Sequence, residues 1–263
     1  MCGRYVVVAS VEEIEKRFQV TAAQLPFDFQ PNFNLGPGSL APVITNDKPN
    51  ELQFFTFGMT PFWAKKRMYL FNARAEGDGN MDNDPDYKGG KGIISKPSFR
   101  KPIRSQRCLV IADAFIEGSY AEGLDKPHLV YLYRRPFAFA GIWDVWKNPE
   151  TEQEVHSFAI ITTTANPLLQ KIPHHRSPVI LHERDERRWL RAEHLQEITT
   201  LLEPYPAEEM NAYPISPKVK SPKATGRELI EPVGERLQPE LELRMKTELR
   251  LQGMGAGKRD HRH

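Results

Sequence analysis

Residues 137–164, FAFAGIWDVWKNPETEQEVHSFAIITTT, contain two apolar runs separated by a polar turn. The first run, FAFAGIWDVW (137–146), and the second, HSFAIITTT (156–164), are rich in the aromatic and β-branched residues that favour strands. Turn residues separate the two runs, and this close spacing favours antiparallel pairing. The stretch therefore predicts two antiparallel strands.

Short apolar runs of the same kind continue on both sides of this stretch. They are separated by turn residues and lie at 5–8, 41–45, 51–59, 107–115, 128–133 and 177–181. Their close spacing favours an α+β fold, a β-rich domain of mainly antiparallel strands, over repeated βαβ units.

Helices are expected only at the flanks of this domain. Ser10 and Glu13 have the spacing of a capping box, which predicts a helix of about ten residues starting there. Apolar residues at helical spacing predict a second helical stretch within 184–203. Residues 21–41, which are rich in Pro, Asn and Gly, are predicted to form an ordered loop.

Composition excludes several classes of protein. The chain has 263 residues, of which 40% are apolar, and this is enough for a substantial core. It has neither a membrane-spanning apolar run nor a secretory leader, and its two cysteines are too few for a disulfide framework or a four-ligand zinc site. We therefore expect a cytoplasmic protein that does not associate with membranes.

The distribution of charge is more informative than the net charge of +2, which by itself does not indicate nucleic-acid binding. Residues 95–107 and 216–227 are basic and contain no acid, although each could be a solvated surface. Residues 77–92, GDGNMDNDPDYKGGKG, have the composition of an exposed flexible loop. Residues 236–263 form a charged tail whose end is expected to be disordered.

Cys2 directly follows the initiator Met1. Removal of Met1 would expose an amine and a thiol on adjacent carbons, and an aldehyde can condense with that amine to form an imine. The neighbouring thiol can then trap the imine as a five-membered thiazolidine ring, helped by its proximity. An α-amine with a pKa of about 7.7–8.0 is partly neutral near pH 7. The competing interpretation is a cysteine that happens to sit at a frayed chain end.

Other polar residues follow strand-like runs. Asn72 can donate and accept hydrogen bonds, and Arg74 is available for a phosphate, although this pair is a weak signal alone. Glu117 ends an apolar strand, where burial would raise its pKa and suit it to general acid or base chemistry. A glutamate in a solvent-facing turn would give the same pattern.

Two adjacent histidines, His174 and His175, precede Arg176 and a further apolar strand. One of them could transfer protons near neutral pH, and a surface loop is the other interpretation. Carboxylates at a suitable spacing are absent from these segments, so we expect no metal site and no cofactor.

Together these segments resemble the SOS response-associated peptidase family, whose members sense abasic sites in single-stranded DNA through an N-terminal cysteine. The resemblance covers residues 2–235, which we take as one domain with a barrel or sheet core and 77–92 as an insertion. It rests on separate motifs in the family's order, which are MCGR, PNFNLGPG, FGMTPFW, NARAE, KPSFR, RCLVIADAFIEG, PFAFAGIWD, TTTAN, HHRSPVIL and GRELIEPV.

The resemblance implies a sensor and shield of abasic sites. Met1 would be removed by self-cleavage or by an aminopeptidase, and Cys2 would form a thiazolidine with the ring-opened deoxyribose aldehyde. The protein would act as a monomer on single-stranded DNA that contains abasic sites, and it would associate with the nucleoid when bound.

The resemblance also implies roles for particular residues. The catalytic residues would be Cys2, Asn72, Glu117 and His174. The family's motif selects His174 over His175, because its histidine lies four residues before the proline. Residues that contact DNA phosphates or pack against bases would be Arg4, Pro37, Trp63, Arg74 and Arg176.

Two other functions are compatible with parts of the sequence. Glutamine amidotransferases also use a cysteine directly after Met1, but they follow it with Asn-Gly and Gly-Asp motifs. The chain has no Asn-Gly, and its Gly-Asp occurs only within 77–92. A noncatalytic module that binds single-stranded DNA is the other alternative.

Overall fold

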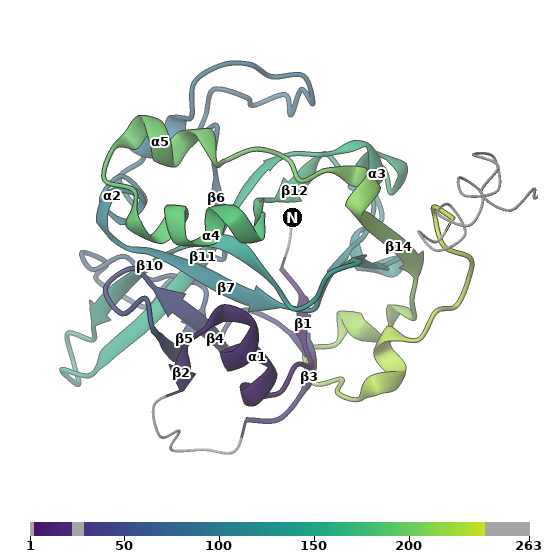
Figure 1. Cartoon of the computed structure of the whole chain (residues 1–263), viewed down its shortest axis with the longest axis horizontal. Helices are drawn as coiled ribbons and strands as arrows, with labels where there is room; N and C mark the ends of the chain where they lie inside the picture. Colours follow the sequence, from purple (N-terminus) through teal and green to yellow (C-terminus); the bar gives the residue numbers. More distant parts are fainter. Residues whose placement is uncertain (1–2, 23–28, 240–263) are drawn as a thin grey trace, which may run out of the picture.

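The computed structural model describes residues 3–22 and 29–239. These residues form two mainly antiparallel sheets with short helices around them, as Figure 1 shows. The β-rich α+β class predicted from the sequence is confirmed. The strands are β1 (Tyr5–Val7), β2 (Thr21–Ala22), β3 (Asn32–Leu35), β4 (Leu40–Thr45), β5 (Glu51–Phe57), β6 (Asn72–Arg74), β7 (Arg107–Ala112), β8 (Ala114–Glu117), β9 (His128–Leu132), β10 (Phe137–Lys147), β11 (Glu154–Thr164), β12 (Arg176–Pro178), β13 (Ile180–Leu181) and β14 (Met210–Pro214).

The helices are short and lie around the sheets (Figure 1). The α-helices are α1 (Val11–Phe18), α2 (Pro102–Ser105), α3 (Pro167–Lys171), α4 (Glu183–Arg191) and α5 (Leu195–Thr200), and single 3₁₀ turns cover Gly92–Ser95, Gly123–Asp125, Ala207–Glu209, Pro217–Lys220 and Arg227–Ile230. No helix in the described ranges is long and apolar enough to cross a membrane.

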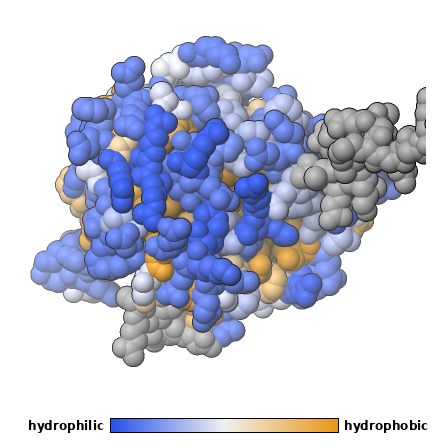
Figure 2. All heavy atoms as spheres, in the orientation of Figure 1, coloured by the Kyte–Doolittle hydropathy of each residue, from blue (hydrophilic) through white to orange (hydrophobic). Residues whose placement is uncertain are grey.

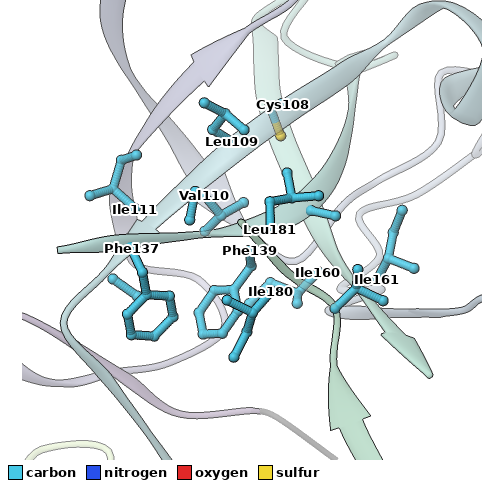
Figure 3. Close-up of a cluster of buried hydrophobic side chains, with 14 of the residues drawn as sticks. Cys108, Leu109, Val110, Ile111, Phe137, Phe139, Ile160, Ile161, Ile180 and Leu181 are labelled. Atoms are coloured by element: carbon cyan, nitrogen blue, oxygen red, sulfur yellow. The ribbon is translucent and has the colours of Figure 1, made fainter. Parts of the chain in front are cut away.

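The larger sheet closes into a barrel. Strands β10 and β11 pair antiparallel, with Gly141 opposite Ile160, so the hairpin predicted from 137–164 is confirmed. The order then runs β10, β7, β4 and β5, and β5 returns to pair in parallel with β11. Figure 3 shows apolar side chains from β7, β10, β11 and β13 gathered in the core. This closed ring gives the functional segments a rigid support.

The smaller sheet has the order β14, β9, β8, β1, β3. The predicted run 107–115 is divided at Asp113 between β7 of the barrel and β8 of this sheet. The carboxylate of Asp113 accepts hydrogen bonds from the backbone N–H groups of Val8 and Ala9, at 2.7 and 2.9 Å. These bonds fix the chain where β1 ends and where the two sheets meet.

The first helix follows the capping rule. Ser10 accepts a hydrogen bond from the Glu13 N–H at 3.2 Å, and the Glu13 carboxylate accepts one from the Ser10 N–H at 2.7 Å. The helix then buries Ile14 and Phe18 on the side that faces the core. The capping box predicted from the sequence is therefore confirmed.

One expectation about local structure is wrong, and the helical stretch expected within 184–203 is present as two helices, α4 and α5. The 21–41 segment is not a continuous loop, because Asn32–Leu35 forms β3 and pairs with β1. The helical stretch 184–203 is interrupted, because the chain is extended at Ala192 and His194. Buried Arg107 donates to the Trp189 and Ala192 carbonyl oxygens, and these bonds replace the hydrogen bonds of a continuing helix.

The surface seen in Figure 2 is mostly hydrophilic, and apolar residues are visible there only in small separate areas. Within the described part of the chain, the exposed large apolar side chains include the aromatic residues Phe62, Trp63, Tyr69 and Tyr120. Aromatic rings at the surface are candidates for contacts with a ligand, because their burial would be favourable.

Candidate active site and DNA-binding surface

Strand β1 (Tyr5–Val7) pairs with β8, and the residues just before β1 run alongside the end of β8 at Glu117. Tyr5 pairs with Phe115, and the Ile116 N–H donates to the Arg4 carbonyl oxygen at 2.9 Å. When this register is extended by one residue beyond the Arg4–Ile116 hydrogen bond, Gly3 falls opposite Glu117. Cys2, the predicted nucleophile, lies outside the described residues, but Gly3 follows it directly in the sequence. The predicted acid–base residue Glu117 therefore lies beside the first described residue of the chain.

Glu117 and His174 form a buried pair. Their side chains are 4% exposed each, and 3.4 Å separates Glu117 Oε2 from His174 Nε2. Burial raises the pKa of Glu117 to about 7, because a carboxylate loses its hydration in an apolar surrounding. Burial also lowers the pKa of His174 to about 4. Near neutral pH the pair consequently holds a glutamate that can gain or lose a proton beside a neutral imidazole.

The orientation of His174 is set by its other ring nitrogen. His174 Nδ1 lies 2.8 Å from the Arg176 carbonyl oxygen, which can only accept a hydrogen bond. The Arg176 N–H also lies 3.3 Å from Nδ1, but the shorter contact with the carbonyl oxygen favours the Nδ1–H tautomer, which leaves Nε2 as an acceptor that faces Glu117. Protonated Glu117 can therefore donate a hydrogen bond to the neutral imidazole of His174.

Replacing Glu117 with glutamine is expected to raise the free energy of unfolding at and above neutral pH. The folded protein holds a proton on Glu117 until about pH 7, whereas an exposed glutamate loses it near pH 4.5. Ionisation of wild-type Glu117 therefore opposes folding increasingly as the pH rises between these values, by roughly 3 kcal/mol in total. Glutamine cannot ionise, so Glu117→Gln is expected to gain this difference.

Urea unfolding of both proteins at about pH 5 and about pH 8 measures the effect. The matched control is Glu150→Gln, which removes an exposed carboxylate from the turn between β10 and β11. A gain for Glu117→Gln of the same size at both pH values would contradict the prediction.

The barrel strand β11 brings two predicted motifs together. Strand β6, which is the Asn72–Arg74 segment, pairs in parallel along one edge of β11, with Arg74 opposite Thr162. Strand β12 pairs along the other edge, with Arg176 opposite Thr164. Because paired and alternate residues point to the same face, Asn72, Arg74 and Arg176 share one face of the sheet. Asn72 itself is half-buried, and its Nδ2 donates to the Phe71 carbonyl oxygen at 3.1 Å.

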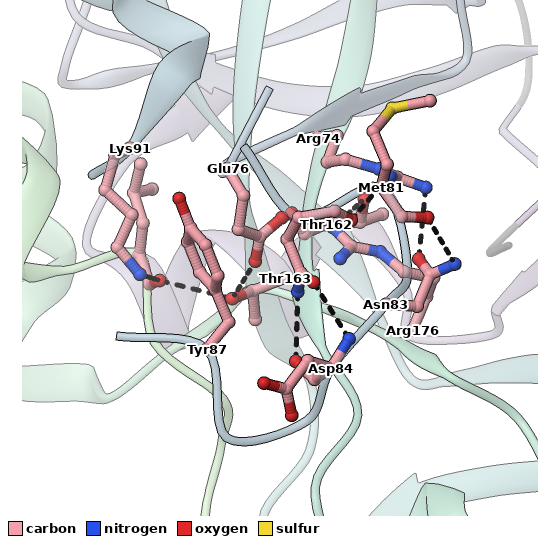
Figure 4. Close-up of polar contacts among 12 residues, drawn as sticks. Arg74, Glu76, Met81, Asn83, Asp84, Tyr87, Lys91, Thr162, Thr163 and Arg176 are labelled. Carbon is pink, nitrogen blue, oxygen red and sulfur yellow. Dashed lines mark hydrogen bonds and ion pairs between the residues drawn. The ribbon is translucent and has the colours of Figure 1, made fainter. Parts of the chain in front are cut away.

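Arg176, a predicted phosphate contact, lies in the interior and forms an ion pair with Glu76. Both side chains are 1% exposed, and Arg176 Nη2 lies 2.8 Å from Glu76 Oε2. The Thr163 hydroxyl donates to the other carboxylate oxygen at 3.0 Å, as Figure 4 shows. Arg176 Nε and Nη1 have no hydrogen-bond partner among the described residues. Sequence reasoning missed Glu76, although it belongs to the quoted NARAE motif.

Arg74, the other predicted phosphate contact in this network, is held by the 77–92 loop (Figure 4). Its Nη1 donates to the Asn80 carbonyl oxygen at 3.0 Å, and its Nη2 donates to Asn83 Oδ1 at 3.1 Å. At the end of the loop, the Lys91 ammonium lies 2.8 Å from a Glu203 carboxylate oxygen. A phosphate that binds Arg74 would therefore compete with the loop for its donors.

The remaining predicted DNA contacts differ in exposure. Arg4 is half-buried, and it donates to Asn34 Oδ1 at 3.0 Å and to the Lys220 carbonyl oxygen at 3.3 Å. Pro37 is exposed in the loop between β3 and β4, and Trp63 is 49% exposed in the segment after β5. Both apolar surfaces are thus accessible to a base.

The described ranges contain no group of three or more His, Cys, Asp or Glu side chains that could hold a metal ion. The site therefore combines two groups suited to acid–base chemistry, Glu117 and His174, with the arginines Arg74 and Arg176 on one face of the sheet.

A comparison with known families places the chain in one of them. The family model described as SOS response associated peptidase (SRAP) matches residues 1–222. The chain belongs to this family. The resemblance inferred from the separate sequence motifs is thereby confirmed, and those motifs include the SRAP segments that carry Asn72, Glu117 and His174. The roles of these residues stay predictions.

Relatives of this SRAP protein carry names that describe an activity. The abasic site processing protein YoqW of Bacillus subtilis is 34% identical over 239 residues, which cover 88% of this chain and 99% of YoqW. The abasic site processing protein HMCES of Gallus gallus is 25% identical, over 78% of this chain and 67% of HMCES.

Solved structures share the SRAP fold of this chain. A crystal structure of a protein from Bacteroides thetaiotaomicron has a TM-score of 0.73 and 29% identity, and the match covers 89% of this chain and 100% of that protein. A protein from Bordetella bronchiseptica has a TM-score of 0.63 at 22% identity, which shows the fold alone, over 82% of this chain and 100% of the other.

Proposed function

We propose that this protein senses and shields abasic sites in single-stranded DNA by forming a covalent thiazolidine between Cys2 and the ring-opened deoxyribose. The names of YoqW and HMCES, which describe abasic site processing, support the substrate class. The observation that carries the proposal is the position of the Glu117–His174 pair beside Gly3, the residue that follows Cys2.

The chemistry uses the proton affinities of this pair. The α-amine of Cys2 adds to the aldehyde carbon, and loss of one water gives an imine. The thiol then adds across the C=N bond, so that a C–S bond forms and the proton of the thiol ends on nitrogen. Protonated Glu117 supplies the proton that lets the hydroxyl leave as water, and His174 is proposed to exchange protons with the sugar oxygens. No oxidant or reductant is consumed.

Self-processing is a second part of the proposal. Hydrolysis of the Met1–Cys2 peptide bond consumes one water and exposes the amine that the cross-link needs. Glu117, with its pKa raised to about 7, is suited to take a proton from that water and pass it to the new amine. Asn72 is proposed to position the reacting backbone or the sugar through its amide.

DNA binding is proposed to use both charged and apolar contacts. Arg4, Arg74 and Arg176 are proposed to contact phosphates, and the two buried Arg176 N–H groups without a described partner support this role. Pro37 and Trp63 are proposed to pack against flanking bases. We propose a monomer in the cytoplasm that associates with the nucleoid through DNA.

The test is incubation of the purified protein with a single-stranded oligonucleotide whose one uracil has been converted to an abasic site. We expect an adduct that resists denaturing electrophoresis, and its intact mass should equal the protein without Met1 plus the oligonucleotide minus one water. The controls are the uracil oligonucleotide and the borohydride-reduced abasic oligonucleotide, which lacks the aldehyde. Neither should give an adduct.

Other outcomes would favour the alternatives. Equal noncovalent binding to the aldehyde and to its reduced form, without an adduct, would overturn the proposal in favour of a noncatalytic binding module. Release of ammonia from glutamine, without an adduct, would favour an amidotransferase.

A further inference from the structure

A short ladder of aromatic rings leads from the Glu117–His174 pair to the surface. The His174 and His175 rings are stacked, with an interplanar angle of 5° and 5.4 Å between centroids. The ring of Tyr120 packs edge-on against His175 with 4.4 Å between centroids. Tyr120 is 76% exposed, the largest exposed fraction among the prominent apolar side chains of the described residues. The outermost ring of the ladder therefore lies in solvent next to the site.

The backbone holds Tyr120 in this place. Its N–H donates to the Pro173 carbonyl oxygen at 3.0 Å, which ties the loop after β8 to the histidine segment. The loop itself is tight, because a Cβ added at Gly118 would lie 1.7 Å from the Gly123 carbonyl oxygen. Only glycine fits at 118, so the chain turns directly after Glu117 and carries Tyr120 over His175.

We propose that Tyr120, supported by His175, is a stacking platform for a nucleobase next to the abasic nucleotide. This inference rests on the proposed function, because it places the abasic nucleotide at Glu117 and His174. In the free protein the apolar faces of this tyrosine ring are in contact with water, which is unfavourable. A base that stacks on the ring removes this contact. An abasic site also leaves its neighbouring bases with one stacking face uncovered. The platform covers that face and holds the sugar against the acid–base pair.

The experiment is a cycle that combines Tyr120→Ala with removal of one base from the DNA. Binding is measured with oligonucleotides that carry a tetrahydrofuran in place of the abasic sugar, so no covalent step contributes. One set keeps both flanking bases, and two others replace the base on the 5′ or the 3′ side by a second tetrahydrofuran. We expect Tyr120→Ala to weaken binding to the first set on the order of ten-fold.

The coupling is the decisive result. On the side where the base stacks, removal of that base should lower the affinity of the parent protein about as much as Tyr120→Ala does. The same removal should lower the affinity of the Tyr120→Ala variant little further. Tyr120→Phe should bind like the parent protein, because the ring is kept. The matched control is Tyr133→Ala, which removes a tyrosine just beyond β9, at the end remote from the His128–Glu117 pairing.

Two results would overturn the inference. One is unchanged affinity of Tyr120→Ala, and the other is a loss that is the same whichever flanking base is present. Failure of the proposed function would be seen separately, as a parent protein that binds these oligonucleotides but forms no adduct with the aldehyde.

Discussion

Cys2→Ala is expected to abolish the denaturation-resistant adduct with abasic DNA. The terminal amine of this variant could still condense with the aldehyde, but without the thiol no ring can form and the imine hydrolyses readily. The loss should be on the order of a hundred-fold or more in the yield of adduct, since no other group replaces the nucleophile. Binding to the tetrahydrofuran oligonucleotide should stay close to that of the parent, because the reacting sulfur is not needed there.

Cys108 offers a matched control, because it is the only other cysteine in the sequence. It lies on β7 in the barrel core with a fully buried side chain, and burial raises the pKa of its thiol well above the ordinary value. A buried neutral thiol is a poor nucleophile. Cys108→Ala should therefore cross-link like the parent. Retention of the adduct in Cys2→Ala would contradict the mechanism.

Glu76→Gln is expected to lower the free energy of unfolding by about 3–5 kcal/mol. The variant leaves the Arg176 guanidinium, whose side chain is 1% exposed in the folded protein, without its carboxylate. The Thr163 hydroxyl also loses its charged acceptor. Urea unfolding near neutral pH measures the change.

Two further variants test whether the buried, unpaired charge causes this loss in the free energy of unfolding. Glu51→Gln breaks the exposed pair of Glu51 with Lys48, and it should cost less than about 1 kcal/mol. Adding Arg176→Met to Glu76→Gln removes the stranded charge, and much of the lost stability should return. If Glu76→Gln unfolds at the same urea concentration as the parent, the ion pair does not stabilise the fold.

Local patterns predicted much of the fold because they depend on neighbours in the sequence. The 137–164 hairpin follows from two apolar runs and a short turn, and the capping box of Ser10 and Glu13 lies within one turn of helix. Strand β14, Met210–Pro214, has a weak strand pattern and was missed. It forms because β9 offers it an edge to pair with, along the register Met210 to Leu132.

The candidate site divides in the same way. The position of Glu117 at the end of an apolar run predicted a buried carboxylate, and the structure buries it. The importance of Glu76 could not be predicted, because its partner Arg176 is 100 residues away in the sequence. The hydrogen bond from Arg74 to the 77–92 loop could not be predicted either. Its acceptor is the backbone carbonyl oxygen of Asn80, whose direction depends on the folded loop.

The sequence by itself determined the chemical inventory of this protein: a cysteine at position 2 that can expose two nucleophiles, and the motifs that place it in the SRAP family. Only the tertiary structure decided how that inventory is arranged. The closed barrel brings β6 and β12 to opposite edges of β11, and β8 carries Glu117 to within 3.4 Å of His174. Strand pairing between distant segments creates these distances, and burial, which exists only after folding, sets the proton affinities of the pair.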